Sequence, residues 1–218
     1  MKVVSVILAR GGSKEIPGKN IIKLCDRSLI SYAIQASLDS ASEETWVSTD
    51  CPRIKSEAIS CGANVLDRPS NISGDNSKSE SALLHFVQNV DCDVVVFIQP
   101  TSPMINSDHI NSGISLIGKY DSVISVYKEH WVPSWRYIGV VPHPIGWDPA
   151  SRPMRQDMDP IYIENGAFYI TTSHLVTRNE LRASGSIGFL EMSRADSIQI
   201  DSYSDLALAE KILSTKYE

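Results

Sequence analysis

The residues best suited to chemistry stand in a short basic loop near the N-terminus. Arg10, Lys14 and Lys19 occur within ten residues of one another. The residues between them include small ones, among them Gly11, Gly12 and Ser13. Glycines let backbone N–H groups approach an anion closely, and arginine and lysine supply positive charge. The loop therefore predicts a phosphate site, and three cations suit a triphosphate better than a single phosphate.

The spacing in this loop differs from the common phosphate-binding motifs. Neither the P-loop pattern nor GxGxxG occurs in the stretch VVSVILARGGSKEIPGKN at 3–20. Its apolar part, 3–9, contains only Ser5 as a polar residue and predicts a strand buried on both faces. A buried strand that opens into a glycine-rich basic loop favours an anion site. An ordinary polar connection between a strand and a helix is the alternative.

Buried apolar runs alternate with helical patterns along the first half of the chain. Strands are predicted at 45–50, 63–66 and 93–98, and helices at about 29–38, 54–61 and 80–90. Such alternation is typical of a doubly wound, mostly parallel α/β sheet, in which ligands bind at the carboxyl ends of the strands. The basic loop and the polar segments 48–50, 68–69 and 99–103 all follow strand ends. We therefore expect these segments to lie together.

The composition changes between Trp131 and Pro160, where three of the four tryptophans and six of the eleven prolines fall. No strand or helix period is clear there except at 136–141. We interpret 131–160 as an excursion from the sheet whose aromatic side chains are buried by a second subunit. A long loop packed on its own domain is the alternative. Further on we predict strands at 167–170, 188–192 and 197–201, and helices at about 173–180 and 204–215.

Length and composition predict one soluble domain. The chain has 218 residues, of which 42% are hydrophobic and 21% charged. A net charge of −6 argues against nucleic-acid binding, and apolar runs of about seven residues are too short for a membrane span. Four cysteines without CxxC spacing predict reduced thiols and a cytoplasmic location, and we expect no signal peptide.

The segment RGGSKEIPGKN closely resembles the signature of the CMP-sialic acid synthetases, or N-acylneuraminate cytidylyltransferases. Further matching motifs follow in order: STD at 48–50, RP at 68–69, QPTSP at 99–103, RQD at 155–157, ENGAFYI at 164–170 and IQID at 198–201. The resemblance covers nearly the whole chain. It implies a nucleotide-diphospho-sugar transferase-like domain, formed by 1–130 and 161–218. It also implies a homodimer in which the excursion is exchanged between subunits.

The same resemblance implies CTP and a nine-carbon sugar acid as substrates. A sugar hydroxyl would attack the α-phosphorus of CTP, and pyrophosphate would leave. Such a transfer needs positioning and charge neutralisation rather than a protein nucleophile. We expect Arg10, Lys14 and Lys19 to neutralise the triphosphate. Backbone N–H groups of the loop would add hydrogen bonds, namely those of Gly11, Gly12 and Ser13.

Four further positions match the part of the family pattern that binds the nucleoside. By this match Asn20 and Arg68 contact the nucleoside, and Ser77 and Ser79 lie in the segment that reads cytosine. Considered without the resemblance, serines in a loop before a helix are usually helix caps. The assignment of the two serines therefore depends on the resemblance.

The predicted sugar site combines neutral hydrogen-bonding groups with one cation. Uncharged donors and acceptors suited to a polyol stand at Gln99, Thr101 and Ser102. Arg155 is the natural partner of the sugar acid's carboxylate, because a guanidinium matches a carboxylate with two parallel hydrogen bonds. A surface ion pair with Asp157 or Asp159 is the alternative role. The matched stretch ENGAFYI adds Asn165 and Tyr169.

The resemblance also implies a Mg²⁺ site formed by two aspartates, two residues apart on one strand. Here the pair is Gln199 and Asp201. Strand periodicity keeps both side chains on one face, and an amide oxygen can ligate Mg²⁺, although more weakly than a carboxylate. Asp196 falls on the other face, and the five histidines match no ligand spacing. We assign Mg²⁺ to Asp201 and Gln199.

Two other functions are compatible with these motifs. One is a cytidylyltransferase for the eight-carbon acid Kdo, but its loop usually reads RxxSxRLPxK. The other is a non-catalytic nucleotide-binding homologue, for which Gln199 is the only support. The loop sequence favours an enzyme of the sialate type.

Overall fold

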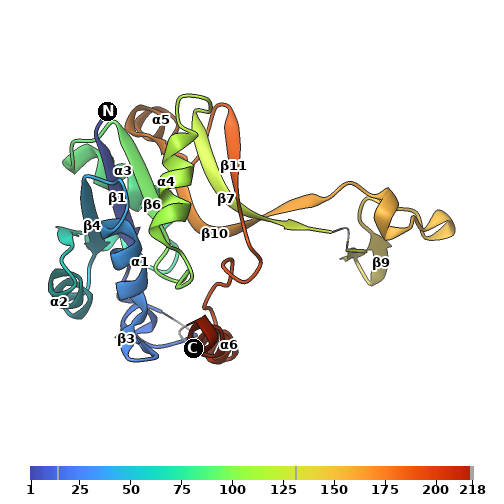
Figure 1. Cartoon of the computed structure of the whole chain (residues 1–218), viewed down its shortest axis with the longest axis horizontal. Helices are drawn as coiled ribbons and strands as arrows, with labels where there is room; N and C mark the ends of the chain where they lie inside the picture. The colour runs from blue at the N-terminus through green and yellow to red at the C-terminus, as the bar shows by residue number, and fades with distance from the viewer. Residues whose placement is uncertain (14, 131, 217–218) are drawn as a thin grey trace.

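The computed structural model describes residues 1–13, 15–130 and 132–216. A sheet of seven strands in the order β11-β7-β10-β6-β1-β4-β5 forms its centre (Figure 1). Its strands are β1 (Val3–Leu8), β4 (Glu44–Thr49), β5 (Asn64–Asp67), β6 (Val94–Ile98), β7 (Ser122–Glu129), β10 (Ile161–Thr172) and β11 (Ile187–Met192). Only β10 pairs antiparallel, between β6 and β7. The predicted mostly parallel α/β sheet is confirmed.

Helices cover both faces of the sheet. They are α1 (Leu29–Leu38), α2 (Pro52–Ser60), α3 (Ser79–Asn89), α4 (Ser107–Ser115), α5 (Ser173–Asn179) and α6 (Tyr203–Lys216). Alternate residues of β1 point to opposite faces, so Ile7 packs with α1, α2 and α4, whereas Val4 and Val6 pack with α3 and α5. This two-sided burial explains why β1 and β6 are nearly uninterrupted apolar runs. Among the described residues, no helix has the length and apolar character needed to cross a membrane.

Short elements surround the first loop. A 3-10 turn, η1 (Lys19–Ile21), follows the basic residues, and a small hairpin of β2 (Lys23–Leu24) and β3 (Arg27–Ser28) leads into α1. A second 3-10 turn, η2 (Ser70–Ile72), follows β5 and precedes α3. Along the chain, the first loop thus lies between β1 and η1.

The excursion leaves the body of the molecule as a separate arm (Figure 1). It carries a hairpin of β8 (Trp135–Ile138) and β9 (Val141–Pro144), and two 3-10 turns, η3 (Pro149–Ser151) and η4 (Arg155–Asp157). Gly139 takes a φ of 62° in the connection between β8 and β9, a region open to glycine at little cost. Apolar side chains on the arm are exposed, among them Tyr137 at 76% and Val140 at 91%. Trp131 lies outside the described residues.

The strand predicted at 197–201 is wrong. Residues 194–197 form turns, and 198–201 have no regular secondary structure and lie outside the sheet. The N–H of Ile200 donates a backbone hydrogen bond to the Thr101 carbonyl. The cause is local, because the Ser193 hydroxyl donates to Asp196 and accepts from its backbone N–H, which turns the chain after β11.

Candidate active site

A cavity of about 290 Å³ opens where β1 and β6 end. Three segments that are distant in sequence meet there: the basic loop, the turn after β6 and the stretch before α6. The predicted site residues that line it are Arg10, Gly12, Ser13, Lys19, Asn20, Gln99, Thr101 and Asp201. The expectation that polar segments at strand ends lie together is met here for the basic loop and the segment after β6, whereas 48–50 and 68–69 contribute residues to a neighbouring hollow.

Two hydrogen bonds that involve backbone atoms of the first loop hold it in shape. The N–H of Gly11 donates to Asp50 Oδ1 at 2.8 Å, and the buried Asn20 donates from Nδ2 to the Arg10 carbonyl at 3.0 Å. A Cβ on Gly11 would lie 2.8 Å from that of Cys51, so this close approach requires glycine. The side chain of Asn20 thus fixes the loop, and the Gly11 N–H is engaged by Asp50.

Each described cation of the loop contacts a carboxylate from a remote part of the chain. Arg10 Nη1 lies 2.9 Å from Asp75 Oδ1, and Lys19 Nζ lies 2.9 Å from Asp201 Oδ1. Lys14 lies outside the described residues. The Lys19 side chain is mostly buried, whereas that of Asp201 is 69% exposed. Because the carboxylate of each pair is open to solvent, these ion pairs are weak, and a phosphate could replace either carboxylate at modest cost.

Arg68 lies behind the loop, at the end of β5. Its Nη2 donates to the Ser48 carbonyl at 2.6 Å and its Nε to the Ser48 hydroxyl at 3.1 Å. Burial lowers the pKa of the Arg68 guanidinium to about 10, so the group stays charged at neutral pH. Arg68 borders a neighbouring hollow with Asp50 rather than the 290 Å³ cavity. It places a buried positive charge beside the loop.

Ser77 and Ser79 flank the start of α3. The N–H of Ser77 closes a turn onto the Gly74 carbonyl at 3.0 Å, and no side chain caps the helix. The reading of these serines as helix caps is therefore not observed. Asp75 lies in the same turn and binds Arg10, so the segment 74–79 is joined to the phosphate loop.

Gln199 connects the turn after β6 to strand β10. Its Oε1 accepts from Thr101 Oγ1 at 2.7 Å. Its Nε2 donates to the carbonyl of Asn165 at 2.7 Å and to the hydroxyl of Ser102, which is fully buried. The amide is thus used in three internal contacts, while Asp201 faces Lys19. A metal-ligand role for Gln199 stays a prediction.

Asn165 and Tyr169 do not line the cavity. Asn165 is buried at an irregularity of β10, where its Oδ1 accepts from the Ser125 hydroxyl at 2.7 Å and its Nδ2 donates to Ser197 at 2.8 Å. Tyr169 is buried on the face of the sheet that α3 and α5 cover. Both residues support the strand ends from within the fold.

Arg155 stands apart from every other predicted site residue. It lies in η4 on the arm, is exposed, and does not line the cavity of its own chain. Within the part of the chain that the structure describes, it forms no ion pair with Asp157 or Asp159. The alternative role of Arg155 as a local ion-pair partner is therefore not observed.

The donor groups around the cavity fit a weakly held Mg²⁺. Across the described residues, no cluster of three or more His, Cys, Asp or Glu side chains could hold a metal. Asp201 and Glu15 are the carboxylates that line the cavity. Mg²⁺ commonly binds through one or two carboxylates together with water and substrate phosphates. Asp201 fits as such a single protein ligand.

Comparison with known proteins places the chain in a family. The family model described as cytidylyltransferase matches residues 4–212. The chain belongs to the cytidylyltransferase family. An N-acylneuraminate cytidylyltransferase of Oncorhynchus mykiss is 37% identical over 96% of this chain and 50% of its own length. A CMP-N,N'-diacetyllegionaminic acid synthase of Legionella pneumophila is 34% identical over 100% of this chain and 99% of its own.

The recognised resemblance to N-acylneuraminate cytidylyltransferases is thus confirmed, and the chain spans about half the length of the first of these relatives. A solved structure of a CMP:2-keto-3-deoxy-manno-octonic acid synthetase complexed with CTP superposes with a TM-score of 0.76. It covers 99% of this chain and 100% of its own at 17% identity. That likeness shows a shared fold.

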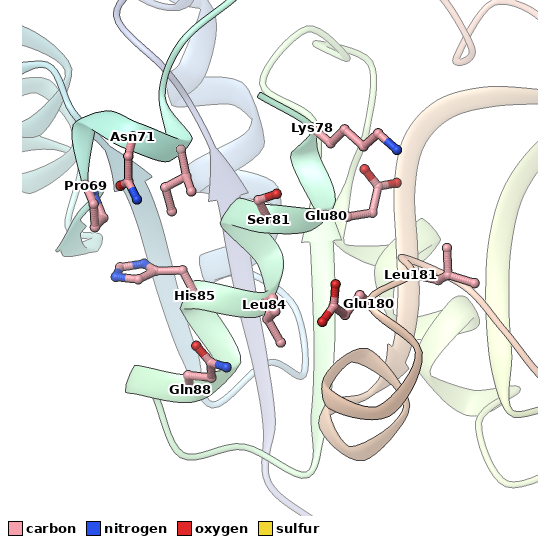
Figure 2. A pocket seen from close by; sticks show the side chains of 11 residues that line it. Pro69, Asn71, Lys78, Glu80, Ser81, Leu84, His85, Gln88, Glu180 and Leu181 are labelled. Carbon is pink, nitrogen blue, oxygen red and sulfur yellow. The ribbon is translucent and has the colours of Figure 1, made fainter. Parts of the chain in front are cut away.

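A second, larger hollow of about 630 Å³ lies over α3 and the end of α5 (Figure 2). Its lining mixes charges of both signs, among them those of Lys78, Glu80 and Glu180. None of the predicted site residues lines it. Size alone therefore does not identify the site, and we place it where the basic loop and the strand ends converge.

Sequence reasoning missed the acidic partners of the loop. Asp50 and Asp75 shape and pair with it, and Ser48 orients Arg68. Asp50 and Ser48 belong to the matched STD motif, which was the signal that could have identified them, although neither residue was assigned a role. Asp75 had no comparable signal, because its partner Arg10 is 65 residues away in the sequence.

Proposed function

We propose that this chain transfers CMP from CTP to the anomeric hydroxyl of a nonulosonic acid, such as N-acetylneuraminate, and releases pyrophosphate. The observation that carries the proposal is the single cavity shared by Arg10, Lys19, Gln99, Thr101 and Asp201. Relatives named for N-acylneuraminate and for diacetyllegionaminic acid support this substrate class. The four cysteines are free thiols, which agrees with a cytoplasmic location.

The triphosphate would bind by exchanging ion-pair partners. Arg10 would leave Asp75 and Lys19 would leave Asp201, and both cations would then contact phosphate oxygens. The two contacts neutralise negative charge that grows on the leaving pyrophosphate, which is the main requirement of in-line transfer. The Ser13 and Gly12 backbone is open to the same cavity and can donate further hydrogen bonds.

The sugar acid would lie over the turn after β6. Gln99 and Thr101 line the cavity and offer neutral donors and acceptors to hydroxyl groups. Gln199 stands where the family pattern has an aspartate. Its amide orients Thr101 and thereby supports the turn after β6 over which the sugar acid would lie. When bound, Mg²⁺ supplies positive charge to the phosphates, and Asp201 is the residue that would hold it.

The arm supports a homodimer with shared sites. Its exposed apolar side chains include Trp135, half exposed, and Tyr137 and Val140. An exposed apolar patch of this kind marks an interface. Because Arg155 is far from its own cavity along the arm, we place it at the partner's site, where its guanidinium would bind the carboxylate of the sugar acid.

The test is pyrophosphate release with CTP and a panel of acids: N-acetylneuraminate, a diacetyllegionaminic acid and Kdo. We expect turnover with a nine-carbon acid and little with Kdo. Turnover confined to Kdo would replace the proposal with the Kdo-type activity. CTP binding without turnover on any acid would indicate a non-catalytic homologue.

A further inference from the structure

On the face of the sheet opposite α1, a single arginine joins three elements. Arg182 follows α5, and its Nε donates to Glu80 Oε1 at 2.6 Å. Glu80 lies in the first turn of α3, on the side that faces the loop bearing Leu181 (Figure 2). Both side chains are largely buried, at 29% and 20% exposure. Burial opposes ionisation of Glu80, but the hydrogen bond from Arg182, the bond to its own backbone and the charges of Arg182 and Lys78 together outweigh burial and lower the pKa of that carboxyl.

The same guanidinium lies over two aromatic rings. Its Cζ is 5.0 Å from the ring centre of Tyr169 in β10 and 5.7 Å from that of Phe97 in β6. The two rings stack at 5.7 Å, and the Tyr169 hydroxyl donates to Glu164 at 3.1 Å. A partly desolvated cation over aromatic rings, with a charge-assisted hydrogen bond, is a rigid contact. Arg182 therefore fixes α3 against β6 and β10.

Two of these contacts adjoin the proposed substrate segments along the chain. Glu80 follows Ser79 in the chain, and Gln99 is two residues after Phe97. On the cavity side, the segment 74–79 is joined to the loop through Arg10 and Asp75, a pair that the triphosphate would open. The Arg182 contact contains no phosphate-binding residue, so it persists while the nucleotide binds.

We propose that Arg182 is a positioning residue for nucleobase selection, acting through Glu80 and the first turn of α3. Arg182 sets the distance between the segment 74–79 and the turn that begins at Gln99. The space left for the base then has the size that cytosine requires. This inference rests on the proposed function. Base selection needs closer placement than phosphate binding, because a pyrimidine ring is read by directional hydrogen bonds.

The test compares equilibrium binding of CTP and UTP by titration calorimetry, with Mg²⁺ present. The variants are Arg182→Lys, Arg182→Met and Glu80→Gln. The control is Arg178→Met, which removes an exposed arginine from the last turn of α5. We expect the parent and the control to prefer CTP. In the three variants CTP affinity should fall about tenfold while UTP affinity changes about twofold or less, so that selectivity drops.

If Arg182 had a merely structural role, the variants would lose affinity for CTP and UTP together, or would only melt at a lower temperature. Either result overturns the inference. Glu80→Gln keeps the shape of the side chain, so it remains informative if the Arg182 variants fail to fold. A parent that binds CTP and UTP equally well overturns the inference too. Binding with normal selectivity but without turnover leaves the inference standing and contradicts only the proposed catalysis.

Discussion

The cavity at the strand ends and the projecting arm differ in whether their side chains find partners within the chain. Arg10 and Lys19, which line the cavity, and Gln199, which contacts the lining residue Thr101, each already have partners within the chain. On the arm, Tyr137 and Val140 present apolar surface that the chain itself does not cover. In the function we propose, the cavity is organised before its ligand arrives and exchanges contacts when the ligand binds, whereas the arm is covered by a partner surface.

The largest expected effect belongs to Asp201. Asp201→Asn removes the proposed anionic ligand of Mg²⁺ and should nearly abolish turnover at ordinary Mg²⁺ concentrations. The control is Asp196→Asn, whose carboxylate is engaged with Ser193 outside the cavity. A Mg²⁺ titration of the rate at fixed CTP and sugar checks this. If Asp201→Asn titrates like the parent, the metal is held elsewhere.

Next in size is the loss of Lys19. Lys19→Ala should raise the activation barrier by about 2–4 kcal/mol, because one charge-assisted contact to the developing pyrophosphate is lost. The fold should survive, since this loop lysine contributes no core packing. Lys23→Ala, in the neighbouring hairpin, serves as the control. Near-normal kcat/KM in Lys19→Ala would exclude the loop as the triphosphate site.

The arm is tested through assembly. Trp135→Glu places a charge in the apolar surface that we expect a second subunit to cover, and an unpaired buried charge disfavours association. We expect the parent to be a dimer by light scattering at micromolar concentration and the variant to dissociate. Ile59→Glu alters an exposed apolar residue on α2 of the body and should leave the dimer intact. A monomeric parent would contradict the role given to the arm.

The smallest effect is expected at Gln199. Gln199→Asp adds a second carboxylate beside Asp201 and should lower the Mg²⁺ concentration for half-maximal rate. The same change removes the donors to Ser102 and to the Asn165 carbonyl, so it should cost about 1–3 kcal/mol of stability. Gln199→Ala should lose stability without improving Mg²⁺ use. Equal Mg²⁺ dependence in the parent and Gln199→Asp would remove position 199 from the metal site.

Sequence patterns predicted the elements whose buried side chains are almost all apolar. The strand β6 is apolar without a break, β1 is interrupted only by Ser5, and Pro52 begins α2 as expected at a first helical turn. Because parallel strands end at one edge, the convergence of the basic loop with the segment after β6 was also predictable.

The elements that patterns missed have polar or small residues inside. Ser122 and Ser125 are buried in β7 with their hydroxyls hydrogen-bonded, which disguises the strand. In α4 the inward position 113 is glycine, because a Cβ there would lie 2.8 Å from Ile170. Likewise, the three contacts of Gln199 join residues 34 to 98 positions apart, which no local pattern can show.

The most direct test of the central claim is a crystal structure of the chain soaked with CTP and Mg²⁺. The account predicts the triphosphate in the 290 Å³ cavity, with Arg10 and Lys19 on its oxygens and released from Asp75 and Asp201. CTP seated in the 630 Å³ hollow over α3, or bound with both ion pairs intact, would contradict the account.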